Sequence, residues 1–143
     1  MFTFHQIAQH FVYTFGLKAL PHLAPLTLGS AIAGSVAFLQ HDRAKPKGPY
    51  VERMGLGFSG AVSGVVTAAA LLFPTRKMLL MGIIPMPLWV LGLGYIAYDT
   101  YSMDAVDSTV GHDAHIGGAV FGAAFYMVFL RRFGGLLGAR RGF

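Results

Sequence analysis

The feature that most constrains this chain is a succession of apolar stretches, each long enough to cross a membrane. A helix of about 17 to 21 residues with few or no charged side chains spans a hydrocarbon core of roughly 30 Å. Five such stretches cover residues 3–20, 23–40, 55–73, 78–98 and 113–131. The pattern predicts an all-α membrane protein with about five transmembrane helices, in a single domain over residues 1–143.

The composition favours lipid as the surrounding solvent. Of the 143 residues, 55% are hydrophobic and 12% are charged, which is about half the charged share of a soluble protein. The chain has no cysteine, which excludes a disulfide framework and a thiolate metal site. A net charge of +5 would favour nucleic acid only if the basic residues formed one face with aromatic residues among them. They cluster between the apolar stretches instead, so we expect membrane lipid as a partner and no nucleic acid.

The charged residues separate between the two sides of the predicted membrane. When the five stretches are threaded back and forth, seven basic residues share one side without any acidic residue, and all six acidic residues lie on the other side. The seven are Lys18, Arg76, Lys77, Arg131, Arg132, Arg140 and Arg141. The positive-inside rule makes their side cytoplasmic or, in a mitochondrion, the matrix side. The stretches 55–73 and 113–131 then begin on the outer side.

Ser59 and His115 lie about equally deep, roughly 6 Å inside the outer ends of their stretches. Each is followed by glycines spaced four residues apart, which let two membrane helices approach closely. These are Gly60 and Gly64 in one stretch and Gly118 and Gly122 in the other. A neutral imidazole within hydrogen-bond reach activates a serine hydroxyl as a nucleophile. The pattern therefore predicts a Ser-His dyad inside the bilayer.

Other polar residues in the stretches have simpler explanations. Ser30 and Ser63 are expected to be packing residues, whose hydroxyls bond the carbonyl four residues earlier. His22 and His41 are expected to reach the interface or to bond a carbonyl. All acidic residues fall at the ends of stretches or in loops, so no intramembrane acid indicates a transporter.

Several motifs resemble those of the rhomboid intramembrane serine proteases, and of their mitochondrial and plant-organelle branch most closely. Residues 57–62 (GFSGAV) are similar to the GxSG helix of the family, and residues 111–122 (GHDAHIGGAVFG) to its AHxxGxxxG helix. Residues 84–89 (IPMPLW) and 98–99 (YD) resemble the helix between them, and residues 4–14 resemble the HxxxxHxxxN helix. The resemblance implies a rhomboid-like helical bundle in which the first core helix of the family is missing.

The resemblance also implies roles for individual residues. Ser59 corresponds to the nucleophile and His115 to the general base. His10, Thr14 and the backbone near Ser59, including Gly57, correspond to the oxyanion site, and Thr14 stands where the family has asparagine. Acyl-enzyme chemistry of this kind uses no metal and no cofactor.

A pair of prolines lies inside the predicted helix 78–98. Pro85 and Pro87 remove backbone donors and are expected to kink or loosen this helix. With Trp89, they are expected to form the gate through which a transmembrane substrate enters the site.

Two functions remain open at this point. The first is a rhomboid-type serine endopeptidase that cleaves transmembrane proteins. The second is a catalytically inactive rhomboid-fold subunit of a mitochondrial inner-membrane complex, in which neighbouring membrane subunits cover the missing helix. Both place the chain in a membrane, either the mitochondrial inner membrane or another organellar or bacterial one.

Overall fold

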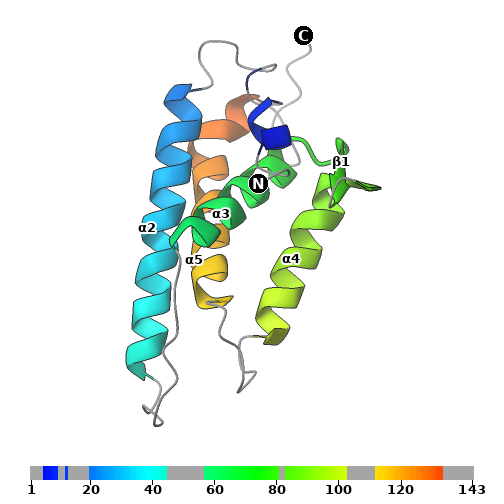
Figure 1. The fold of residues 1–143 in the computed structure, drawn as a ribbon. Coiled ribbons are helices and arrows are strands. Elements are labelled where there is room, and N and C mark those ends of the chain that lie inside the picture. Colours follow the sequence, from blue (N-terminus) through cyan, green and yellow to red (C-terminus); the bar gives the residue numbers. More distant parts are fainter. Residues whose placement is uncertain are drawn as a thin grey trace.

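The computed structural model describes residues 5–9, 12, 20–44, 57–80, 83–102 and 112–133. Its principal elements are the helices α2 (Leu20–Ala44), α3 (Gly57–Leu72), α4 (Leu88–Ser102) and α5 (His112–Phe125), and the strands β1 (Lys77–Leu80) and β2 (Ile84–Pro87). The helix α5 continues through a π-helical turn (Tyr126–Leu130) and a 3₁₀ turn (Arg131–Phe133). Figure 1 shows α3 between α4 and the pair formed by α2 and α5. This helical bundle confirms the all-α prediction, to which the two strands add one short hairpin.

The helix α3 is the central element of the bundle. Every residue from 63 to 70 is buried, and a helix that is apolar and buried on all sides belongs inside a bundle rather than at its surface. Its sequence is rich in Ala, Gly, Ser and Val, so three neighbouring helices can pack around a narrow cylinder. The predicted helix 55–73 agrees with this element within two residues at each end.

The outer faces of the bundle are apolar as well. On α2, an exposed stripe of large apolar side chains runs along one face and consists of Leu28, Ile32, Val36 and Leu39. Such a face would be an aggregation-prone patch in water, but it suits contact with lipid tails. By length and composition, Pro21–His41 and His112–Phe133 can cross a membrane, and Phe58–Leu72 is a shorter apolar helix. Both observations agree with the predicted membrane protein.

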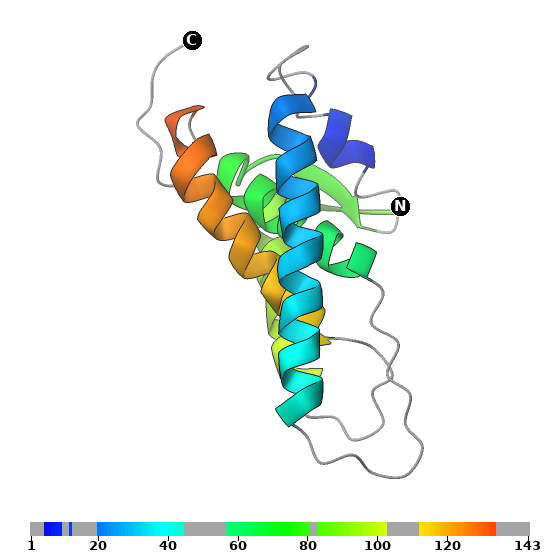
Figure 2. The same ribbon diagram turned by 90° about the vertical axis from the view of Figure 1, so that its left-hand side faces the viewer.

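The chain reverses direction from α2 to α3, from α3 to α4 and from α4 to α5, as the threading predicts (Figure 1). Figure 2 shows α2 from its outer side, in front of the other helices. We call the end that holds Leu20, Leu72, Leu88 and Phe133 the hairpin end, and the end that holds Ala44, Gly57, Ser102 and His112 the polar end. The described basic residues of the hairpin end, Arg76, Lys77, Arg131 and Arg132, are all exposed. The described acidic side chains, Asp99 and Asp113, both lie toward the polar end. The predicted charge separation therefore holds for the described side chains.

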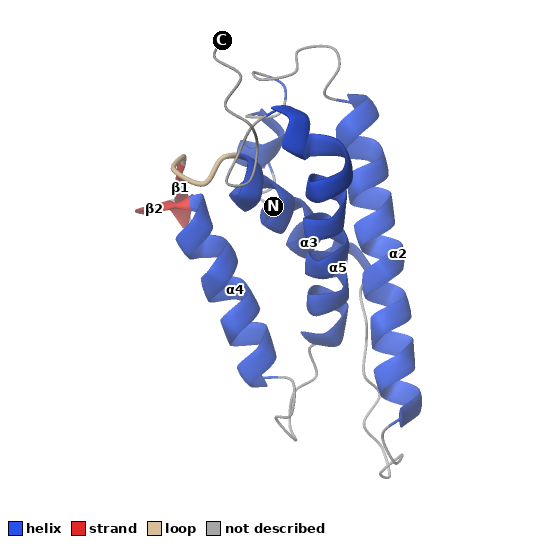
Figure 3. Cartoon of the chain, turned by 180° about the vertical axis from the view of Figure 1, so that it is seen from behind, coloured by secondary structure: helices blue, strands red, loops and turns tan. Residues whose placement is uncertain are grey.

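The prediction of one helix over residues 78–98 is wrong at its start. Residues 77–80 and 84–87 form the antiparallel strands β1 and β2, in which Lys77 pairs with Pro87 and Leu79 with Pro85 (Figure 3). Proline lacks a backbone N–H and its ring clashes with the preceding helical turn, so a helix that included Pro85 and Pro87 would lose two hydrogen bonds. The helix α4 begins directly after Pro87 instead, and neither proline kinks it.

The start of the first predicted helix also lies elsewhere than expected. Residues 5–9 are helical, but Ile7 is 1% exposed and packs at the hairpin end, where Ala69, Met78 and Leu88 surround it. The threading of the five stretches predicts this segment on the outer side, where the stretch 55–73 begins, at the opposite end of α3. The burial of a large apolar side chain contributes about 1.5 to 3 kcal/mol to stability, so the burial of Ile7 stabilises the segment in this position.

Candidate functional site

Glycines bring the backbones of α2, α3 and α5 into direct contact near the predicted dyad. A Cβ atom on Gly60 would lie 2.9 Å from the carbonyl oxygen of Ala114, and a Cβ atom on Gly34 would lie 2.6 Å from that same oxygen. Ser59 precedes Gly60, and His115 follows Ala114. The two predicted catalytic residues are therefore the direct neighbours of a pair whose backbones touch, which agrees with their predicted common depth.

The glycine spacing noted in the sequence has the predicted effect. A Cβ atom on Gly118 would overlap the carbonyl group of Gly60, and one on Gly122 would overlap the carbonyl group of Gly64. Each of these positions admits only a hydrogen atom in place of a side chain. The two helices consequently pack with backbone against backbone, which gives van der Waals contact where lipid supplies no hydrophobic drive.

A small cavity lies beside His115. It has a volume of about 10 Å³ and is lined by Ser63 and Thr67 of α3, Tyr95 and Asp99 of α4, and His115 of α5, with apolar side chains around them. A cavity of roughly this size holds one water molecule when polar groups line it. Ser63, interpreted from sequence as a packing residue, thus shares a cavity with the predicted base. Ser59 is partly buried one helical turn earlier, on the same side of α3.

A buried carboxylate binds both histidines of α5. The Nδ1 atom of His115 lies 2.8 Å from Asp99 Oδ1, and the Nδ1 atom of His112 lies 2.9 Å from the same oxygen. Asp99 is 3% exposed and His112 is 5% exposed, so the cluster is nearly closed to solvent. An ionised carboxylate can only accept hydrogen bonds, so each imidazole donates its Nδ1–H to it. In that arrangement the Nε2 atom of each neutral ring carries a lone pair.

The sequence did not predict this cluster. Asp99 lies in the last turn of α4, at a helix end as predicted, but its side chain is buried in the bundle. One signal was available, because His112 and His115 are three residues apart and share one face of a helix. The position of Asp99 against that face depends on how α4 packs on α5, and no local pattern shows it.

A second, partly buried pair lies near the cluster, toward the polar end. The Nδ1 atom of His41, on α2, lies 3.4 Å from Asp113 Oδ1, on α5. His41 was expected to reach the interface or to bond a carbonyl, and its partner is a carboxylate instead. The pair connects the last turn of α2 to the first turn of α5.

The other predicted site residues are Gly57, the two oxyanion residues and the three gate residues. Gly57 begins α3. His10 and Thr14 lie outside the described residues, so their predicted oxyanion role remains a prediction. Pro85 and Pro87 lie in β2, and Trp89 lies in the first turn of α4 with 50% of its surface exposed.

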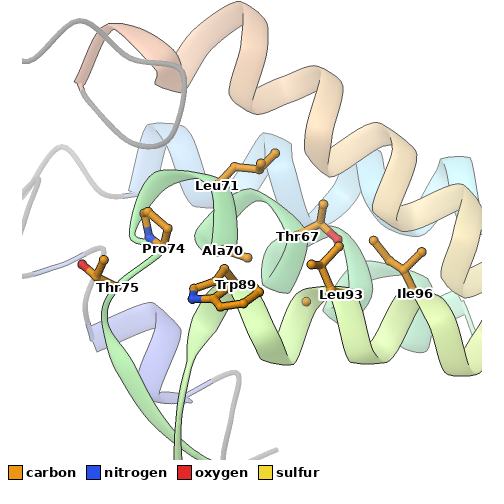
Figure 4. A pocket seen from close by; sticks show the side chains of 9 residues that line it. Thr67, Ala70, Leu71, Pro74, Thr75, Trp89, Leu93 and Ile96 are labelled. Carbon is orange, nitrogen blue, oxygen red and sulfur yellow. The ribbon is translucent and has the colours of Figure 1, made fainter.

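A larger, almost wholly apolar cavity separates α3 from α4. Its volume is about 410 Å³, and Trp89 and Leu93 of α4 face Ala70 and Leu71 of α3 across it (Figure 4). Thr67 and Ile96 line both this cavity and the small one beside His115. The two cavities are therefore adjacent, and together they extend from the hairpin end to the histidine cluster.

Comparisons with known proteins agree with these features. The family model described as a rhomboid domain matches residues 2–132. RHOMBOID-like protein 12, mitochondrial, from Arabidopsis thaliana is 31% identical over 127 residues, which cover 78% of this chain. The chain spans 38% of the length of that relative. No solved structure is significantly similar to the chain.

Proposed function

The chain belongs to the rhomboid family, and from that premise we propose that it is an intramembrane serine protease that cleaves transmembrane proteins. Ser59 is the proposed nucleophile and His115 the proposed general base. The main support for the proposal is the backbone contact of Gly60 with Ala114, which are the sequence neighbours of Ser59 and His115. The hydrogen bond between Asp99 and the imidazole of His115 adds to it. A relative with no protease activity would not need a base that is held in one tautomer.

The proposed reaction follows from that tautomer. With its Nδ1–H donated to Asp99, His115 can take the Ser59 hydroxyl proton on Nε2 while Ser59 Oγ attacks the scissile carbonyl. The protonated imidazole then gives this proton to the leaving amine, which leaves an acyl-enzyme on Ser59. A water molecule activated by His115 hydrolyses the acyl-enzyme in the second half of the reaction. The small cavity beside His115 is a fitting place to keep that water in an apolar bundle.

The oxyanion site is also a proposal. His10, the Thr14 hydroxyl and backbone N–H groups near Gly57 are the proposed donors to the developing negative charge. One missing donor of this kind costs on the order of 10² to 10³ in rate, so Thr14 in place of asparagine is compatible with slow catalysis. We further propose that the whole chain acts as one domain in the mitochondrial inner membrane, because its relative from Arabidopsis thaliana carries a mitochondrial designation.

A direct test uses the full chain reconstituted in lipid vesicles with a protein substrate that has one transmembrane segment. We expect cleavage within or beside that segment, and no cleavage by the His115→Ala variant, because the serine hydroxyl is inert without its base. A folded chain that cleaves no such substrate and reacts with no serine-directed probe would indicate the alternative, an inactive structural subunit.

We predict that Asp99→Asn lowers the rate of reaction at Ser59 by roughly 10² to 10⁴-fold. An asparagine amide can donate to His115 Nδ1, which favours the tautomer with its proton on Nε2, where it cannot accept the serine proton. The measurement is the rate of covalent labelling by a fluorophosphonate probe. Asp113→Asn is the matched control, since Asp113 is a buried acid of the same cluster region that pairs with His41. Equal labelling rates in wild type and Asp99→Asn would contradict this role.

The proposed entrance for substrate is the apolar cavity between α3 and α4. This location modifies the predicted gate, since Trp89 lines the cavity while Pro85 and Pro87 precede it in β2. A transmembrane segment could approach His115 along this cavity if α4 moves away from α3. The short α4 packs on the bundle mainly through α3 and α5, and it lies at one edge of the bundle in Figure 3, opposite α2.

We predict that Gly92→Leu slows the cleavage of a transmembrane substrate by roughly tenfold while a small fluorophosphonate probe still labels Ser59. Gly92 borders the cavity, and a Cβ atom there already lies 3.0 Å from the Ala70 methyl group, so a leucine side chain would fill the space. Gly94→Leu is the control, because nothing lies within 4 Å of a Cβ atom at that position of the same helix. Equal losses of cleavage in both variants would argue against this entrance.

A further inference from the structure

We propose that Asp99, His112 and His115 bind a divalent transition-metal ion such as Zn²⁺, and that the bound ion switches off the proposed base. The metal-binding part of this inference needs only the three side chains. The inhibitory part rests on the proposed function of His115.

The donor set fits such an ion. Two imidazole nitrogens and one carboxylate oxygen lie within 4.8 Å of one another, and they come from two different helices. Nitrogen and oxygen donors in this ratio suit Zn²⁺ and its first-row neighbours, whereas Mg²⁺ and Ca²⁺ prefer sites made only of oxygen. The burial of Asp99 and His112 shields the site from competing water, and the His115 side chain keeps 14% exposure as a route of entry.

The present geometry is close to a coordinated one. Ligands held about 2.1 Å from a tetrahedral Zn²⁺ lie roughly 3.4 Å from one another. The two hydrogen bonds to Asp99 Oδ1 are 2.8 and 2.9 Å long, so each nitrogen has to withdraw by roughly 0.5 Å to admit the ion. The small cavity beside Asp99 and His115 has room for about one water molecule, which supplies the fourth ligand that a three-residue site leaves open.

Metal binding would change the tautomer of His115. Without metal, Nδ1 carries the proton and donates it to Asp99, so Nε2 has the lone pair that a general base requires. A neutral imidazole that binds a metal through Nδ1 carries its proton on Nε2 instead. The same ring then has no free lone pair for the Ser59 proton. The ion therefore blocks the base without any contact with Ser59.

Direct binding is the first test. The purified full chain in detergent micelles is titrated with ZnCl₂ in a calorimeter, and we expect about one ion per chain. Even the loss of a residue that only orients a ligand typically weakens metal binding by 10 to 100-fold, so we expect His112→Gln to raise the Kd at least tenfold. His22→Gln is the matched control at the hairpin end, where His22 packs against Phe133, and it should bind as wild type does. An excess of MgCl₂ should not displace the zinc.

A wild-type chain that takes up no zinc, or a His112→Gln chain that binds it equally well, would overturn the site. Thermal unfolding of each variant is measured in parallel. If His112→Gln proves unfolded, Asp99→Asn takes its place, because a neutral amide oxygen is a poor ligand for Zn²⁺ and the side chain keeps its shape. Retained binding in Asp99→Asn would equally reject the site.

Inhibition is the second test, read from fluorophosphonate labelling of Ser59. We expect zinc to suppress labelling of the wild type and EDTA to restore it, while the labelling rate of His112→Gln, compared with its own rate in EDTA, does not change when zinc is added. Labelling that zinc leaves unchanged, in a chain shown to bind the ion, would reject the switch and leave the protease proposal intact. A chain that binds zinc but is never labelled would instead reject the proposed protease and confirm only the metal site.

Discussion

Ser59→Ala should abolish labelling of the chain by a fluorophosphonate probe, whereas Ser63→Ala should leave labelling nearly unchanged. The probe reacts only with a serine whose hydroxyl is deprotonated by a neighbouring base, so we expect a decrease of at least about 10³-fold in the first variant. His115→Ala should cause a similar loss. In-gel fluorescence and the intact mass of the labelled chain measure the effect.

The comparison of the two serines is informative because both lie on one side of α3. Ser63 lines the small cavity together with His115, and the role of Ser59 rests on its place beside Gly60 and on the family motif. If Ser63→Ala lost the label and Ser59→Ala kept it, the nucleophile would lie one helical turn deeper than proposed. If the folded wild type did not react at all, the chain would be an inactive member of its family.

Gly118→Val should destabilise the bundle by about 3 kcal/mol or more, at the upper end of the range for overpacked cores. A side chain at this position overlaps the carbonyl group of Gly60, and a backbone carbonyl cannot rotate away as a flexible side chain can. The helices α3 and α5 would have to separate, and the backbone contact between Gly60 and Ala114 would be lost. The chain has a single tryptophan, so the fluorescence of Trp89 during heating in detergent reports the unfolding.

Gly94→Val is the control for this substitution. It makes the same chemical change in a helix of the same chain, at a position where nothing lies within 4 Å. Valine has a higher helix propensity than glycine, so this variant should be as stable as the wild type or slightly more stable. A Gly118→Val chain that unfolds at the wild-type temperature would show that α3 and α5 do not pack through these glycines.

Much of the fold was predictable from local patterns in the sequence. The bilayer requires every backbone group to be satisfied within its own segment, so a long apolar stretch has little choice but to form a helix. The predicted helix 55–73 matches α3, and the predicted helix 113–131 lies within the continuous helical segment from His112 to Phe133. Glycines at four-residue spacing indicated the contact faces, because the absence of a side chain lets two membrane helices approach closely.

One error concerns the start of the stretch 78–98. This stretch is apolar throughout, but apolarity alone does not distinguish a helix from a strand, and the backbone limits imposed by Pro85 and Pro87 decide nearly half of it. Residues 5–9 are helical as predicted, but their position differs from the threading, because Ile7 packs in the core at the hairpin end. The apolar composition by itself determined neither the two strands nor this position.

What the sequence by itself determined was the membrane environment of this protein and the helical character of its bundle, because each depends on residues close together in the chain. Only the tertiary structure decided which side chains surround His115. Asp99 reaches it across 16 positions of sequence, and Ser63 shares its cavity from another helix. These contacts depend on how α4 and α3 pack against α5. Helix packing results from many weak contacts between distant segments, and no local sequence pattern encodes them.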